Sequence, residues 1–158
     1  MSLKWIAILG VLLFAGVSPS LAQMTGYYPK GGADYGPVDV SLVQLIANPA
    51  AYNHKRVRLI GYLHLEFEGS AVYLHRDDYE VGISRNGVWI NAPHDLTKEQ
   101  RDTVNDHYVI CTAEFDADHQ GHMGMFSGEL TNVTRIEIWP WEKLRELVTQ
   151  KPASPAPK

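Results

Sequence analysis

The sequence predicts a mainly β fold, a single domain built as a five-stranded barrel with short helices between the strands. Apolar residues alternate with other residues through Arg56–Phe67, which is typical of a strand with one buried face. Gly61 stands at one of the apolar positions, and a glycine inside a strand often marks a bend at a barrel corner. The order of the shorter segments that follow is the third observation. We therefore expect a long, bent first strand around which later strands close.

The N-terminus predicts a secretory signal peptide over residues 1–22. Lys4 supplies a positive charge, Trp5–Val17 is an apolar run broken only by glycine, and Ser20-Leu21-Ala22 offers small residues for cleavage before Gln23. The apolar run is shorter than the ~20 residues that a membrane-spanning helix needs. We therefore expect a periplasmic or secreted protein without stable membrane insertion after cleavage.

Charge and cysteine content narrow the function classes. Removing residues 1–22 leaves 136 of the 158 residues, which suits one domain with a single core. Without Lys4, 13 Lys and Arg stand against 18 Asp and Glu, a net charge of −5. Because phosphate backbones require clustered positive charge, we expect no nucleic-acid partner. Cys111 has no second cysteine to pair with, and its place in an apolar strand predicts a small buried residue.

The chain begins with a linker and a capped helix. Residues 23–39 are rich in tyrosine and glycine without a helical or strand period, which predicts a flexible linker. The barrel domain is expected over residues 40–139. Ser41 and Gln44 form a capping box, in which each side chain bonds a free backbone N–H of the first helical turn. Asn48-Pro49 ends this helix.

Two short strands and a second helix follow the long strand. The strands are expected at Ala71–His75 and Val88–Asn91, separated by a charged loop or single helical turn at Arg76–Ile83. Thr97 and Gln100 form a second capping box, which opens a polar helix with few apolar positions. We expect this helix on the surface, in contact with the barrel along a narrow seam.

The fourth and fifth strands are expected at His107–Phe115 and Glu129–Trp139. The apolar period of the last strand breaks near Thr131–Val133, which indicates a β-bulge. Residues 140–150 are expected to form a short terminal helix. Residues 151–158 are rich in proline and alanine and predict a disordered tail.

Three strands, a helix and two strands is the order of the five-stranded Greek-key barrel known as the OB-fold. The opening of small exported bacterial OB-fold-like domains is similar to four parts of this sequence: Leu42–Ile46, Tyr52, Lys55-Arg56-Val57 and Ile60-Gly61-Tyr62. The runs Gly121–Gly124 and Phe126–Gly128 resemble stretches of uncharacterised secreted proteins of that kind. The resemblance implies the fold and no settled activity. His54 departs from it, because a glycine is expected in that turn.

The first candidate site is an aromatic face on the outside of the barrel. OB-fold ligands usually meet the face of the second and third strands and the loops beside it. If the apolar residues face inward, six others face outward there: Tyr62, His64, Tyr73, His75, Trp89 and Asn91. The three aromatic residues and two histidines of this set are the candidate ligand-binding residues. Aromatic surfaces of this kind suit a sugar, a peptide or a base. The alternative is that some of these rings pack under the Arg76–Arg85 loop or the terminal helix as a second small core.

The second candidate site is a loop with residue types that bind metals. Four side chains there could act as ligands: Asp116, Asp118, His119 and His122. Two histidines three residues apart can share a metal, and carboxylates can complete its shell. Met123 and Met125 add thioethers, which suit copper more than zinc. The alternative is a tight turn in which the histidines bond backbone groups, because this spacing is a loosely defined pattern.

Enzyme signatures are lacking in the sequence. Ser127 lies in Phe-Ser-Gly, which is not the G-x-S-x-G nucleophile elbow, and no phosphate-binding glycine loop or zincin motif occurs. The sequence therefore predicts a non-catalytic exported binding module without a cofactor, which contacts a protein partner or small ligand through its aromatic face. The alternative is a periplasmic copper- or zinc-binding protein that uses His119 and His122.

Overall fold

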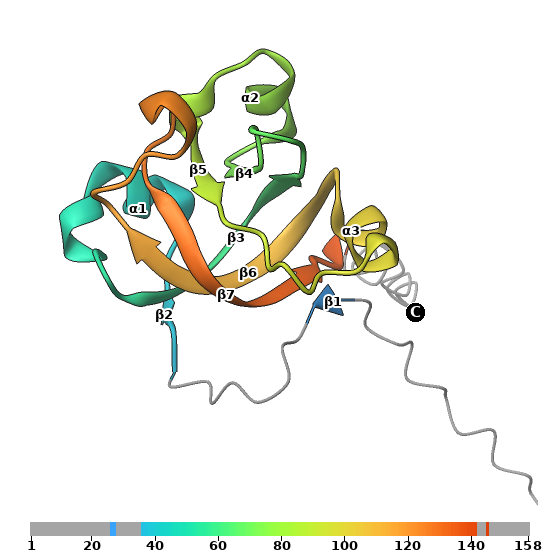
Figure 1. Cartoon of the computed structure of the whole chain (residues 1–158). Coiled ribbons are helices and arrows are strands. Elements are labelled where there is room, and N and C mark those ends of the chain that lie inside the picture. The colour runs from blue at the N-terminus through green and yellow to red at the C-terminus, as the bar shows by residue number, and fades with distance from the viewer. Residues whose placement is uncertain (1–25, 28–35, 142–144, 146–158) are drawn as a thin grey trace, which may run out of the picture.

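A computed structural model describes residues 26–27, 36–141 and 145 (Figure 1). Several sequence-based expectations fall wholly or mostly outside these residues: the signal peptide 1–22, the linker 23–39, the terminal helix 140–150 and the tail 151–158. Among the helices of the described part, none is long and apolar enough to cross a membrane.

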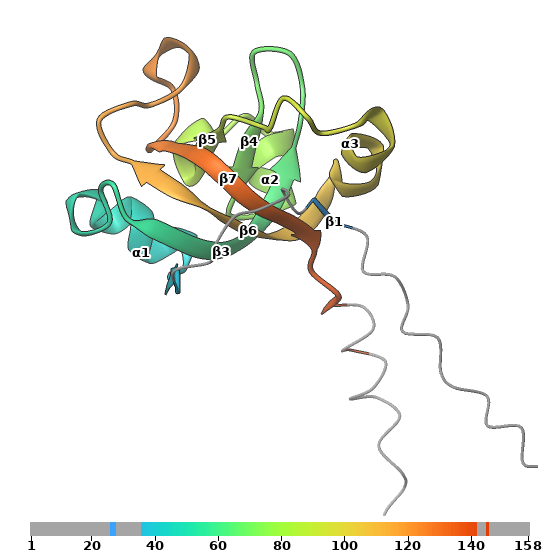
Figure 2. The same cartoon turned by 60° about the horizontal axis from the view of Figure 1, so that its bottom comes forward.

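Five strands form a closed barrel with the topology of an OB-fold: β3 (Arg56–His64), β4 (Ala71–Tyr73), β5 (Gly87–Ile90), β6 (His107–Asp116) and β7 (Glu129–Ile138). Antiparallel pairs join β3 to β4 and β6, β4 to β5, and β6 to β7. The ring closes through a short parallel pairing of β5 with β7, at Trp89–Glu129 and Ile90–Leu130. The predicted mainly β, five-stranded barrel is confirmed (Figures 1 and 2).

Short elements surround the barrel. The strands β1 (Gly26–Tyr27) and β2 (Val38–Asp39) add to β7 and β3 respectively. The helical elements of the described residues are α1 (Leu42–Ala47), η1 (Pro49–Ala51), α2 (Arg76–Glu80), η2 (Ser84–Asn86), α3 (Lys98–Val104) and η3 (His122–Gly124). The helices α1 and α3 lie on opposite sides of the barrel in both views (Figures 1 and 2).

Both predicted capping boxes are present. The Ser41 hydroxyl accepts a hydrogen bond from the Gln44 backbone N–H, and the Gln44 side chain accepts one from the Ser41 N–H. Thr97 and Gln100 make the same pair of bonds at the start of α3. A cap of this kind stabilises a helix by about 1 kcal/mol. In α3 only Val104 is buried, so the helix meets the barrel along the narrow seam that its polar sequence predicted.

Alternate side chains of the long strands fill the barrel. The main examples are Val57, Leu59 and Leu63 of β3, Cys111, Ala113 and Phe115 of β6, and Leu130 and Ile136 of β7. Cys111 is buried, as predicted, and burial raises the pKa of its thiol to about 12. The thiol therefore stays protonated at neutral pH and belongs to the core.

β3 begins at Arg56 as predicted but is shorter than the predicted strand, because a turn follows it. It ends at His64, and Phe67, the last residue of the apolar alternation, is 90% exposed. Glu68 takes a left-handed conformation with φ of 57°, and Ser70 closes the turn by donating a hydrogen bond to the Glu66 carbonyl. The apolar period therefore continues for three residues beyond the strand.

Two other local features follow the sequence pattern. His54, where the resemblance predicted a glycine, has a left-handed φ of 56°, so the turn does adopt a conformation that favours glycine. The predicted bulge lies in β7. Thr112 of β6 pairs with Arg135 and Glu114 pairs with Thr131, so β7 has extra residues between these two pairs. Asn132, inside the bulge, has a φ of 46°.

Gly61 lies where β3 gains its second partner strand. β3 pairs with β6 from Arg56 to Leu63 but with β4 only from Tyr62 to His64. A Cβ atom at Gly61 would lie 2.5 Å from Val72 Cγ1, 2.7 Å from the Tyr73 carbonyl oxygen and 2.8 Å from Leu42 Cδ1. Any side chain at this position would therefore push β4 and α1 away from β3.

We predict that Gly61→Ala lowers the free energy of unfolding by about 3 kcal/mol and that Gly61→Val lowers it further, because the new atoms meet backbone and core. Urea denaturation measures both. Gly82→Ala is the matched control: its backbone is left-handed, with φ of 74°, but apart from its chain neighbours no described residue has a heavy atom within 4 Å of the new Cβ. The control should lose about 1 kcal/mol. Equal losses at the two glycines would contradict the close packing at Gly61.

Candidate functional site

The outer face of β3 and β4 carries a second apolar cluster, which is separate from the barrel core. Tyr62, Ala71, Tyr73 and Phe126 are buried in it, with Tyr79, Trp89 and Tyr108 packed against them. The exposed fractions of Tyr62 and Tyr73 are only 3% and 5%. These two rings lie outside the barrel, as the sequence predicted, but they form the second small core that was the alternative interpretation of this face.

The helix α2 covers the cluster through Tyr79. Its ring stacks on His64, with ring centroids 3.9 Å apart, and lies 6.1 Å from the Tyr62 ring and 5.6 Å from the Tyr73 ring. In both views α2 lies beside β4 and β5 (Figures 1 and 2). The usual ligand face of the fold is therefore occupied in part by the protein's own helix.

The start of α2 explains why β4 ends at Tyr73, before His75, where the predicted strand ends. His75 is the N-terminal cap of α2, and its backbone N–H donates to the Asp78 carboxylate at 3.0 Å. The same carboxylate accepts a hydrogen bond of 2.7 Å from the Asn86 side chain. Asp78 is buried, whereas His75 is exposed and lies apart from the ring cluster. Asp78 thus ties both ends of this loop together.

His64 lies between two carboxylates at the edge of the cluster. Its Nδ1 is 2.6 Å from Asp106 Oδ1, and its Nε2 is 3.6 Å from Glu66 Oε2. The Tyr62 hydroxyl donates to the same Asp106 oxygen at 3.3 Å, and burial, followed by the negative charge of Asp106, raises the pKa of Tyr62 to about 12. The His64 side chain is only 12% exposed. These contacts fix the surface beneath α2 rather than presenting an open binding group.

Of the tyrosine and tryptophan residues in the predicted site, Trp89 is the one that stays partly open. Its indole packs against Phe126, with centroids 5.5 Å apart, and stacks on the His122 ring at 6.5 Å. Gly121 allows this approach, because a Cβ there would lie 2.6 Å from Trp89 Cβ and Cγ. The indole N–H donates to Asn91 Oδ1 at 3.2 Å. These contacts hold the indole in one orientation.

A groove of about 780 Å³ lies beside this indole, and we call it the Trp89 groove. Its walls are β5 with the residues that follow it to Asp95, and the bulge Thr131–Val133 of β7. Asn91 and His94 are exposed on its rim, and the Asn91 amide also donates to the Glu129 carboxylate. Among the described residues that line the groove, none is lysine or arginine.

Of the four candidate metal ligands around the β6–β7 loop, Asp116 and His119 pair with each other, whereas Asp118 and His122 contact other residues. His119 Nδ1 lies 2.7 Å from Asp116 Oδ2, while Asp118 lies 3.9 Å from His54. His122 stacks on the indole described above. Within the residues that the structure describes, no three His, Cys, Asp or Glu side chains form a group that could hold a metal. Metal binding by this loop stays a prediction.

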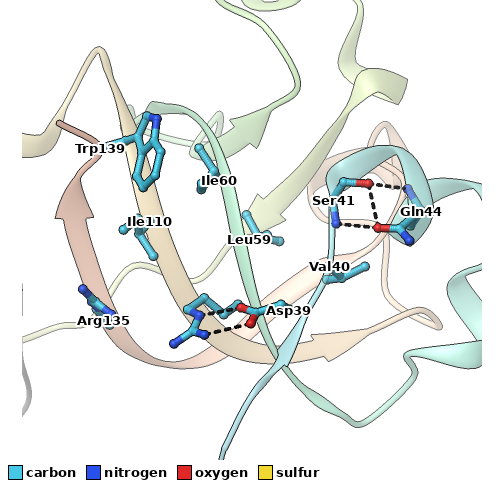
Figure 3. Close-up of a pocket in the computed structure, with 10 residues that line it drawn as sticks. Asp39, Val40, Ser41, Gln44, Leu59, Ile60, Ile110, Arg135 and Trp139 are labelled. Carbon is cyan, nitrogen blue, oxygen red and sulfur yellow. Dashed lines mark hydrogen bonds and ion pairs between the residues drawn. The ribbon is translucent and has the colours of Figure 1, made fainter. Parts of the chain in front are cut away.

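A second groove, of about 620 Å³, was not anticipated from the sequence (Figure 3). It lies between β2–α1 and the outer face of β3, β6 and β7, and we call it the Ile60 groove. Its apolar lining includes Leu59, Ile60, Ile110 and Trp139. Arg58 pairs with Asp39 through bonds of 2.6 and 2.8 Å, and Arg135 pairs with the buried Glu137. These arginine side chains are thus paired with carboxylates of the same chain, and the surface that the Ile60 groove presents is mainly apolar.

Sequence reasoning missed Tyr79 and His94, and it placed Asn91 on the outer face without naming it as a candidate site residue. Tyr79 is the single aromatic residue in the charged segment Arg76–Glu80, which is a signal that one side of this segment is buried. His94 carries no such signal, and the alternation in its strand shows only that Asn91 faces outward. Both residues become neighbours of the β7 bulge only when the barrel closes.

Comparisons with known proteins add little to this geometry. No protein-family model matches the chain, and no curated protein matches it. A crystal structure of a protein assigned as an aspartyl-tRNA synthetase from Leishmania major Friedlin is similar, with a TM-score of 0.41 and 13% sequence identity over 71% of this chain. The match spans 22% of that chain, so this protein covers about a fifth of its length. A similarity this distant does not indicate a function. The comparisons also do not confirm the family resemblance.

We predict that the pKa of His119 lies above its ordinary value of 6.5, because its ring bonds the Asp116 carboxylate. The same bond lowers the pKa of Asp116. The pair therefore stabilises the fold most between pH 3.8 and 6.5, the ordinary pKa values of the two groups. This contribution is lost as the pH falls through the lowered pKa of Asp116 or rises through the raised pKa of His119. NMR titration measures the His119 pKa. Asp116→Asn should return it close to 6.5, whereas the control Asp118→Asn should lower it much less. Equal shifts in the two variants would contradict the assignment.

Proposed function

We propose that this protein is an exported, non-catalytic binding module and that its contact surface is the Trp89 groove. The observation that carries the proposal is a half-buried indole, fixed on several sides, that forms part of the wall of an open groove. Of the aromatic residues predicted to form the site, Trp89 remains a contact residue in this proposal. Tyr62 and Tyr73 then serve as the packed layer behind the site.

The position and size of the groove support binding. β5 is the third strand of the barrel, and OB-fold ligands usually meet the second and third strands. Small-molecule sites typically enclose roughly 300–1,000 Å³, and the Trp89 groove, at about 780 Å³, lies within that range. An aromatic ring with a few polar groups beside it is the common composition of such sites.

The charge of the groove supports a module that does not bind nucleic acid, and the positions of Ser127 and Cys111 support one that is not catalytic. The groove lining lacks lysine and arginine among the described residues, and the expected mature chain is acidic. The Ser127 hydroxyl donates to the Arg85 carbonyl at 2.7 Å, a bond that joins two loops. Cys111 is buried in the core. Export is supported by the charged and apolar N-terminal pattern of residues 1–22.

We predict that Trp89→Ala lowers retention of the native partner or ligand at least about tenfold, because removal of a central aromatic residue commonly costs 2 kcal/mol or more. The measurement is capture from a periplasmic extract by the immobilised mature chain, with bound material quantified by mass spectrometry. Trp139→Ala is the matched control, since it removes a half-buried tryptophan from the Ile60 groove instead.

Because Trp89 also packs against Phe126, the fold of each variant is checked by its melting temperature. Asn91→Ala provides a second test, since this exposed side chain lies on the rim of the Trp89 groove. Unchanged capture by folded Trp89→Ala and Asn91→Ala would overturn the proposal. Copper or zinc retained by the purified mature chain, and lost in His119→Ala/His122→Ala, would favour the metal-binding alternative.

A further inference from the structure

We infer that the ligand of the Trp89 groove is a neutral oligosaccharide. This inference rests on the proposed function and assigns a chemical class to the same site. Three properties of the groove lead to it: the sign of its charge, the kind of polar group on its rim, and the aromatic surface in its wall.

The charge around the groove disfavours anionic ligands. Asp95 lines it, and Glu129 and Glu114 contact its rim, since the amides of Asn91 and Asn132 donate to these carboxylates. Among the described lining residues none is lysine or arginine, and His94 is the one side chain that can carry positive charge, so a phosphate or carboxylate in the groove would meet like charge with little counter-charge. The ligand is therefore neutral or cationic.

The rim carries groups that suit hydroxyls. A side-chain amide offers two N–H donors and two acceptor lone pairs. Asn91 uses one donor on Glu129 and one lone pair on the Trp89 indole, so its fixed amide keeps a donor and an acceptor for a ligand. The exposed Asn132, held by Glu114, offers a second amide in the opposite wall. A sugar hydroxyl both donates and accepts, so it can bond both the N–H and the oxygen of such an amide. An ammonium group only donates and would leave the amide N–H without a partner.

The indole supplies the apolar part of such a site. A sugar ring has an apolar face of C–H groups, which packs on a flat aromatic surface, while its hydroxyls point to the sides. Gly121 and His122 hold the Trp89 ring, so the ring loses little freedom when a ligand binds. The volume of about 780 Å³ is large for one sugar ring and suits a short chain of them.

The test is NMR titration of the ¹⁵N-labelled mature chain with three neutral tetrasaccharides: tetra-N-acetylchitotetraose, cellotetraose and maltotetraose. Tetragalacturonate is the matched anionic control. We expect at least one neutral sugar to shift the Trp89 indole and Asn91 amide signals saturably, with a dissociation constant of about 1 mM or below. Asn91→Ala should weaken this binding at least about fivefold, and Trp139→Ala should leave it unchanged.

No saturable shift with any neutral tetrasaccharide, or tighter binding of tetragalacturonate, would overturn the inference. The proposed function is judged separately by the extract capture described above. Trp89-dependent capture of a peptide or protein, without sugar binding, would retain the binding module and reject the saccharide. If both experiments failed, the groove itself would be excluded as the contact surface.

Discussion

The barrel depends on the absence of a side chain at Gly61. β3 pairs with β6 along most of its length and with β4 only at its end. The Val72 side chain and the Tyr73 carbonyl of β4, together with Leu42 of α1, all approach to within 3 Å of where a Cβ would stand. This close approach lets β4 and β5 turn across the barrel, so that β5 reaches β7 and closes it.

Closure then decides what remains open on the outer face. The chain between β4 and β5 forms α2, and Tyr79 of α2 lies over His64 and its neighbouring tyrosines. The loop between β6 and β7 places Phe126 and His122 against Trp89. Two inserted segments therefore convert a row of outward aromatic residues into a small packed layer. Trp89 stays half-exposed at its edge, beside the gap where β5 and the β7 bulge diverge.

The fold could be predicted from local patterns, whereas most of the site could not. Alternation in β3, the capping boxes at Ser41 and Thr97, and the broken period of β7 each depend on neighbouring residues only, and the structure contains all of them. The end of β3 was misjudged, because Phe67 continues the apolar alternation beyond the turn. The covering of Tyr62 and Tyr73 requires a five-residue helix that is too short to show an amphipathic period. Both grooves join segments far apart in the sequence, so no local signal marks them.

The central claim is that contacts are made at the Trp89 groove and not on the surface of α2. In-cell photo-crosslinking tests it most directly, with a benzophenone amino acid placed at His94 on the rim of the groove or at Arg76 of α2, both of which are exposed. The full chain is expressed in its exported form, irradiated, and analysed for adducts by mass spectrometry. We expect adducts from position 94 and few or none from position 76. Adducts from position 76 alone would place the contact surface on α2 and contradict the account.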